Sequence, residues 1–142
     1  MADIVNRQRK IDLNENELSL FADMAVRNTV EAKNRLPVIA LVDDEEMKRL
    51  NTEFRQMETT TDVLSFRYLE EAFEAPETLG DIVISVPQAQ RQAIENDLDV
   101  MDELRQLILH GILHLCGYDH DTDEGEMDRR EIELRKVLEI NY

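Results

Sequence analysis

The segment LILHGILHLCGYDHD (residues 107–121) combines a long apolar run with all three histidines of the chain. Its first ten residues, 107–116, are apolar nearly all round, which predicts a helix buried in the middle of the domain. His110 and His114 are four residues apart, so on a helix they lie one turn apart on the same face. The segment therefore predicts a central helix with two inward-facing histidines, and buried imidazoles need partners.

Three histidines at this spacing form a candidate metal site. His120 follows His114 by six residues, just past Gly117, which can end the helix. Three neutral imidazoles fill three positions of a tetrahedral zinc ion and leave the fourth open to water, which is typical of a catalytic site. A histidine pair alone often arises by chance, but here every histidine lies within a window of 11 residues. We therefore predict one zinc ion per chain on His110, His114 and His120.

The spacing also matches the metzincin protease pattern H-E-x-x-H-x-x-G-x-x-H, except at the glutamate. Gly111 stands where those proteases carry the general base that takes a proton from the attacking water. Peptide hydrolysis by that route is therefore disfavoured. A glycine inside a helix costs about 1 kcal/mol relative to alanine. We therefore expect a neighbouring strand or a substrate to pass close to the backbone at this position.

The composition is that of one domain of ordinary size. The chain has 142 residues, 42% of them hydrophobic, and we expect a single domain over residues 1–142. The single cysteine, Cys116, excludes an internal disulfide and favours a reducing compartment. We expect it to be a buried, small apolar residue. The sequence has no run typical of a signal peptide and no stretch near 18 apolar residues, which predicts a soluble, cytoplasmic protein.

The net charge of −16 is concentrated in the second half of the chain. Residues 1–67 hold 10 basic and 13 acidic side chains, whereas residues 68–142 hold 6 and 19. An acidic surface argues against charge-driven binding to nucleic acid. Any such binding must use a local basic feature, although each basic residue taken singly is better explained as a solvated charge. The candidates are Arg7, Arg9, Lys10, Lys48, Arg49, Arg55 and Arg67.

The periodicity of the apolar residues predicts an α+β fold with about four strands in a mixed sheet and about five helices. The expected strands are residues 3–9, 36–42, 62–68 and 80–86. The expected helices are residues 15–33, 44–54, 87–94, 99–116 and 123–139. Local signals support their starts, because Asp43 and Asp99 are N-cap residues and Pro87 suits a first helical turn.

Three of these helices carry apolar positions at helical spacing. In the second helix they are Met47, Leu50 and Phe54, and in the third they are Ala89, Ala93 and Ile94. The last helix has an apolar stripe formed by Met127, Ile132, Leu134, Val137 and Leu138. Met127 is more simply a core residue than a hydrophobic floor beneath the metal.

Two further motifs accompany the histidine motif HGILHLCGYDH (residues 110–120). They are NTEFRQMETTTDVLSF (residues 51–66) and LGDIVIS (residues 79–85). In order and spacing the three motifs resemble those of the YbeY family of bacterial rRNA maturation factors, which are regarded as metal-dependent endoribonucleases. With the flanking elements the resemblance covers most of the chain. One departure is a threonine pair, Thr60 and Thr61, where family members usually carry a proline, which affects the rigidity of the loop and leaves the chemistry intact.

The resemblance implies zinc on the three histidines and Arg55 as the basic residue of an active cleft. It also implies cleavage of single-stranded RNA in rRNA maturation, at the 3′ end of 16S rRNA, and in ribosome quality control. The residues suit these roles, because zinc makes water a nucleophile near neutral pH and an arginine fork can hold two phosphate oxygens. Arg55 and His114 are thus the candidate catalytic residues. Asp81 and Asp119 are candidates to orient a histidine by accepting its N–H.

Several alternatives remain open from the sequence. Asp62 and Ser65 either cap a strand or act in the site. The protein could be a zinc hydrolase of another bond, such as a peptide or an ester, or a non-catalytic ribosome assembly factor with a structural zinc. A fourth protein ligand would favour the structural role. Because the surface is acidic, we expect the small ribosomal subunit, or an assembly GTPase, to bring the RNA substrate.

Overall fold

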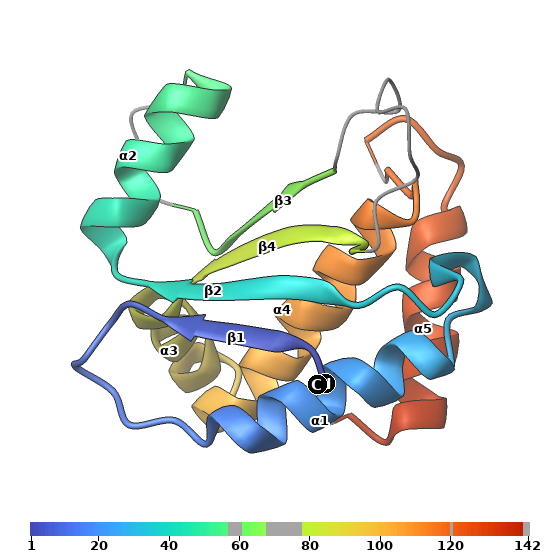
Figure 1. Cartoon of the computed structure of the whole chain (residues 1–142), viewed down its shortest axis with the longest axis horizontal. Helices are drawn as coiled ribbons and strands as arrows, with labels where there is room; N and C mark the ends of the chain where they lie inside the picture. Colours follow the sequence, from blue (N-terminus) through green and yellow to red (C-terminus); the bar gives the residue numbers. More distant parts are fainter. Residues whose placement is uncertain (57–60, 68–77, 120, 141–142) are drawn as a thin grey trace.

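A four-stranded mixed sheet organises the fold (Figure 1). The computed structural model describes residues 1–56, 61–67, 78–119 and 121–140. Its strands are β1 (Asp3–Asn6), β2 (Pro37–Val42), β3 (Val63–Phe66) and β4 (Gly80–Ser85), in the order β1-β2-β4-β3. β1, β2 and β4 are parallel, and β3 runs antiparallel to β4 at one edge. The predicted α+β class with a mixed sheet is confirmed.

Helices flank the sheet in the described part of the chain. They are α1 (Glu15–Arg27), the short 3₁₀ helix η1 (Val30–Ala32), α2 (Asp44–Arg55), α3 (Val86–Glu95), α4 (Val100–Leu115) and α5 (Glu126–Leu138). The expected caps form, because Asp43 and Asp99 each accept a backbone N–H three residues on, at 2.8 Å. None of the helices in these residues has the length and hydropathy needed to cross a membrane.

Two apolar clusters lie on the two faces of the sheet. α1, α3 and α4 cover one face, with α5 packed against α1 and α4, whereas α2 packs on the other face (Figure 1). Because side chains alternate along a strand, β4 sends Ile82 and Ile84 to the α4 side and Val83 to the α2 side. We call the large cluster around α4 the main core. The cluster beneath α2 is the small core, and its buried members are Val42, Met47, Leu64 and Val83.

α4 lies directly against β4 at Gly111. A Cβ atom built on Gly111 would lie 2.9 Å from both Cδ1 and Cγ2 of Ile82. Only a residue without a side chain allows this approach. The expectation that a strand passes close to the backbone at Gly111 is therefore confirmed.

Some apolar positions face solvent rather than the core. On α5 the buried residues are Met127, Glu131 and Leu134, and Met127 belongs to the main core, as a plain core residue would. These three residues are spaced by four and then three positions, so they lie on one face of α5. This buried face is narrower than the apolar stripe predicted for the helix. Four of the apolar positions predicted for the later helices are exposed, Phe54 at 57%, Ile94 at 72%, Ile132 at 45% and Val137 at 57%.

Candidate metal centre and cleft

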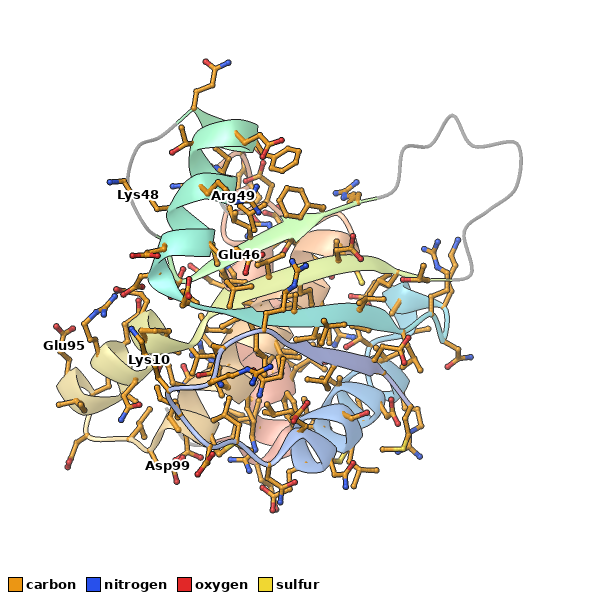
Figure 2. The ribbon with its side chains drawn as sticks, turned by 60° about the vertical axis from the view of Figure 1, so that its left-hand side comes forward. Lys10, Glu46, Lys48, Arg49, Glu95 and Asp99 are labelled. Atoms are coloured by element: carbon orange, nitrogen blue, oxygen red, sulfur yellow. The ribbon has the colours of Figure 1, made fainter. Side chains whose placement is uncertain are left out.

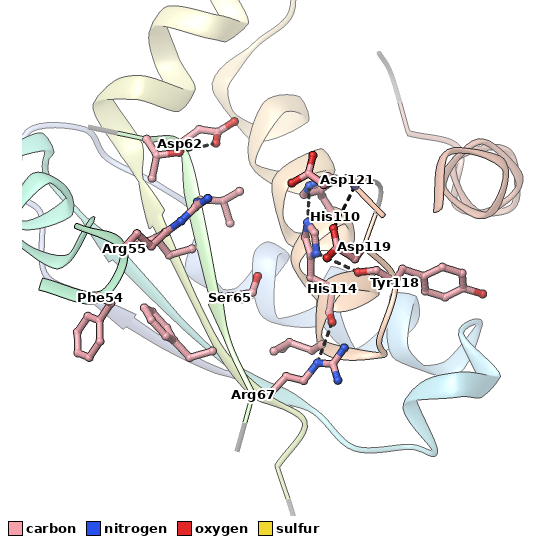
Figure 3. A pocket seen from close by; sticks show the side chains of 15 residues that line it. Phe54, Arg55, Asp62, Ser65, Arg67, His110, His114, Tyr118, Asp119 and Asp121 are labelled. Carbon is pink, nitrogen blue, oxygen red and sulfur yellow. Dashed lines mark hydrogen bonds between the residues drawn. The ribbon is translucent and has the colours of Figure 1, made fainter. Parts of the chain in front are cut away.

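A cleft of about 630 Å³ opens where β3 and the end of α2 face the C-terminal half of α4 (Figure 3). It brings together residues from distant parts of the sequence. The polar residues lining it include Arg55, Asp62, Ser65, Arg67, His110, His114, Asp119 and Asp121. Most of the site predicted from the sequence thus gathers in one place, whereas His120 lies outside the described residues.

The two histidines of α4 point their Nε2 atoms at each other, 3.0 Å apart. The other ring nitrogens face the protein. Nδ1 of His114 lies 3.0 Å from the carbonyl oxygen of Tyr118, and Nδ1 of His110 lies 2.6 Å from Oε1 of Glu131. Because a carbonyl oxygen only accepts hydrogen bonds, Nδ1 of His114 must carry the proton. An ionised Glu131 sets the same tautomer at His110.

This donor set fits a shared metal ion. In neutral imidazoles protonated at Nδ1, the lone pairs of both Nε2 atoms converge on the same point. Two nitrogens bound to one tetrahedral zinc, each at about 2.0–2.1 Å, would lie roughly 3.3 Å apart, close to the distance found here. Within the residues that the structure describes, no three His, Cys, Asp or Glu side chains gather as a metal site. His120 therefore stays the predicted third ligand.

Glu131 is a site residue that the sequence reasoning missed. Its side chain is buried, and Arg135 Nη2 lies 3.5 Å from its second oxygen. Glu131 and the Tyr118 carbonyl, rather than Asp81 or Asp119, orient the two described histidines. Asp119 lines the cleft, and its Oδ1 accepts the backbone N–H of Asp121 at 3.0 Å. A signal was present in the sequence, because Glu131 interrupts the buried face of α5 between Met127 and Leu134.

A second network fixes the segment that follows α4. The Tyr118 hydroxyl donates to Oε2 of Glu31 at 2.7 Å. Arg130 donates to both carboxylate oxygens of Glu31, from Nε at 3.0 Å and from Nη2 at 2.9 Å. Mainly through Arg130, the pKa of Glu31 is lowered to about 2. η1 and α5 therefore hold Tyr118, whose carbonyl in turn holds His114.

Two arginines line the cleft, and they differ in their hydrogen bonds to the rest of the protein. Arg67 Nε donates to the carbonyl oxygen of His114 at 3.3 Å. Arg55, exposed at the end of α2, has no hydrogen bond or ion pair in the part of the chain that the structure describes. No described residue therefore holds its guanidinium in place.

Asp62 and Ser65 differ in what surrounds them. Oδ2 of Asp62 accepts from Gln92 Nε2 at 3.3 Å, and its carbonyl accepts from Ser85 at 2.9 Å, so part of its role is to continue the sheet. Oγ of Ser65 is buried, and no described residue bonds it. Ser65 thus retains an unused polar group at the cleft wall.

The other candidate basic residues do not form an unopposed surface. Figure 2 shows Lys48 and Arg49 on α2 beside Glu46. Arg7 pairs with Glu46 at 2.7 Å, and Arg49 pairs with Glu53 at 3.4 Å. Arg7 and Arg49 are therefore ordinary surface charges paired with acids.

Cys116 is half-buried rather than fully buried. Burial raises the pKa of its thiol to about 11, which keeps it protonated at neutral pH.

A mixed α+β sheet with a histidine pair and an arginine that no described residue pairs, all in one cleft, is typical of a candidate hydrolase. The family described as Endoribonuclease YbeY matches residues 3–139. The chain belongs to the YbeY family.

Individual relatives agree with this assignment. The chain is 41% identical to Endoribonuclease YbeY of Desulforamulus reducens, over 99% of both chains. It is 51% identical to Endoribonuclease YbeY of Nautilia profundicola, over 72% of this chain and 71% of the relative. Among solved structures, the solution structure of TM1509 from Thermotoga maritima is similar, with a TM-score of 0.66 and 28% identity. That match covers 97% of this chain and 89% of the other.

Proposed function

We propose that this chain cuts single-stranded RNA with a metal ion held by His110, His114 and His120. Membership of the YbeY family makes it an endoribonuclease of rRNA maturation. One observation carries the proposal for the site. The Nε2 atoms of His110 and His114 converge in a cleft that also contains Arg55, which no described residue pairs.

The residues of the chain divide the chemistry between them. Glu131 and the Tyr118 carbonyl hold the two imidazoles in the tautomer that presents Nε2 to the cleft. When bound, a zinc ion supplies Lewis-acid activation of water near neutral pH. Arg55 holds phosphate oxygens and stabilises the charge that builds on them in the transition state.

The proton of the attacking nucleophile needs an acceptor, because Gly111 replaces the glutamate of the metzincin pattern. Three carboxylates line the cleft, and each is a candidate for this role. They are Asp62, Asp119 and Asp121.

The net charge bears on how RNA reaches the protein, whereas the family resemblance supports the substrate and the cellular setting. With a net charge of −16, the protein attracts RNA poorly on its own. Its substrate, the 3′ end of 16S rRNA, is therefore presented by the small ribosomal subunit or brought by an assembly GTPase. The same activity serves ribosome quality control in the cytoplasm.

Metal analysis combined with RNA cleavage tests the proposal. Protein purified without a histidine tag should carry about one zinc per chain and cut single-stranded but not double-stranded RNA. His114→Ala should lose both zinc and cleavage, because it removes a ligand. Arg49→Ala, which changes a paired arginine outside the cleft, should retain both. Stoichiometric zinc in a His110→Ala/His114→Ala double variant would contradict the site.

A further inference from the structure

Phe54 is a large apolar side chain that the fold leaves open at the mouth of the cleft. It occupies the last turn of α2, next to Arg55, and 57% of it is exposed. It lines the same cleft as His110 and His114. An aromatic ring in this position contributes little to the core, so its surface is available to a ligand.

The ring of Phe54 is supported from one side. Phe66 of β3 meets it edge to face, with 5.2 Å between ring centroids and 66° between planes. Phe66 itself packs against the small core. Such pairs hold an aromatic ring in a defined orientation. Phe54 is therefore a fixed platform with more than half of its surface open.

The charges of the cleft show why such a platform matters. Arg55 and Arg67 are its only basic residues in the described part of the chain, and they are offset by three aspartates, Asp62, Asp119 and Asp121. Contacts to phosphate therefore supply little net attraction. Stacking of a nucleobase on an aromatic ring needs no charge and favours any base.

The path from Phe54 to the histidines crosses the free edge of β3. Figure 3 shows Phe54 and Arg55 on one side of this strand and the two histidines on the other. The hydrogen bond from the backbone N–H of Ser85 to the carbonyl oxygen of Asp62 shows which residues of this segment point their backbone polar groups toward β4. By the alternation of an antiparallel ladder, the backbone N–H and C=O groups of Val63 and Ser65 point away from β4. No described residue forms a hydrogen bond with these groups. They can therefore form hydrogen bonds with a single strand of RNA that lies along the edge of β3.

We propose that Phe54 is the base-stacking residue of this site. A nucleobase of single-stranded RNA lies on its ring, beside the phosphate held by Arg55, and the strand continues over β3 to the histidines. This inference rests on the proposed RNA-cleaving function. It also gives a reason for the single-strand preference, because a base inside a duplex has both faces covered by its neighbours.

Binding of a short fluorescent single-stranded RNA, followed by anisotropy, tests the role of the ring. Phe54→Leu keeps an apolar side chain and removes the aromatic face, so binding should weaken about 5- to 100-fold. Phe54→Tyr should bind within about 2-fold of wild type. Leu20→Ala, on α1 away from the cleft and 54% exposed in the wild type, should bind unchanged. Zinc content and the salt dependence of binding should be the same in all four proteins.

An oligonucleotide of the same length without bases separates stacking from other contacts. Wild type and Phe54→Leu should bind this strand equally, because without bases neither protein can form the stacking interaction. The inference is overturned if Phe54→Leu binds normal RNA as tightly as wild type does. It is also overturned if the substitution lowers the affinity for the strand without bases by the same factor as for normal RNA. In either case wild-type cleavage would leave the proposed function standing. A wild-type protein that does not cut RNA would instead contradict the proposed function itself.

Discussion

Oε1 of Glu131 on α5 lies 2.6 Å from Nδ1 of His110 on α4, although 21 positions separate the two residues in the sequence. The carboxylate is almost inaccessible to solvent, with Glu131 8% exposed. A buried carboxylate of this kind fixes the tautomer of a metal-binding imidazole and makes its other nitrogen a stronger donor. Glu131 should therefore tune the metal site without touching the metal.

Replacing Glu131 tests this relationship. Glu131→Gln retains an acceptor but removes the charge, so zinc affinity should fall about 10- to 100-fold. Competition with a fluorescent chelator measures this. Asp128→Asn removes a charge from the exposed side of the same helix and should leave the affinity unchanged. Equal affinities for Glu131→Gln and wild type would remove Glu131 from the metal site.

Arg55 separates catalysis from a structural role for zinc. Arg55→Ala should lower RNA cleavage by roughly 100-fold or more, because one charge-stabilising donor is lost. Its free energy of unfolding should stay within about 0.5 kcal/mol of wild type, since the side chain is exposed and no described residue pairs with it. Arg55→Lys should rescue little, because an ammonium group cannot form the bidentate fork. Full cleavage by a folded Arg55→Ala protein would remove Arg55 from the mechanism.

Gly111→Ala tests the contact between α4 and β4. The new methyl group would overlap Ile82, at a cost of about 1–3 kcal/mol, offset by about 1 kcal/mol of helix propensity. We expect net destabilisation of about 1 kcal/mol in urea unfolding. Ile82→Val should cost less in the Gly111→Ala background than in wild type, because it relieves part of the overlap. If Gly111→Ala is more stable than wild type, Ile82 and β4 must shift enough to accommodate the methyl group.

The low pKa of Glu31 predicts a specific dependence of stability on pH. Because its folded pKa of about 2 lies below its ordinary value of 4.5, Glu31 stabilises the fold above about pH 4.5. This contribution is lost as the pH falls toward 2. At pH 7, Glu31→Gln should be about 1–3 kcal/mol less stable than wild type, and the difference should shrink in acid. Glu53→Gln, in an exposed pair with Arg49, should differ from wild type by less than about 0.5 kcal/mol at every pH.

Local sequence signals predicted the parts of the fold that depend on near neighbours. The apolar run of α4, the N-caps Asp43 and Asp99, and the His110–His114 spacing each depend on residues within a turn or two of helix. Short apolar runs, such as residues 36–42, likewise indicated the strands. Element ends were less predictable, and the helix expected over residues 15–33 is instead α1 followed by η1.

Contacts between residues that are far apart in the sequence depend on tertiary packing, and local sequence signals did not predict them. Glu131 reaches His110 only because α5 packs against α4, and Glu31 reaches Tyr118 across 87 positions. A helical pattern also made Phe54 look like a core residue. It is exposed because the end of α2 extends to the rim of the cleft, where no element in the described part of the chain covers it.

The cleft joins two packing units of unequal strength. The histidines belong to α4 in the main core, whereas Phe54 and Arg55 end a helix whose small core contains four buried apolar residues. α2 should therefore open by local fluctuation well below the global unfolding transition, with faster amide hydrogen exchange than α4. Warming would then abolish RNA cleavage while His110 and His114 could still hold the proposed metal ion. Enzymatic inactivation and loss of the fold become two separate events in the same molecule.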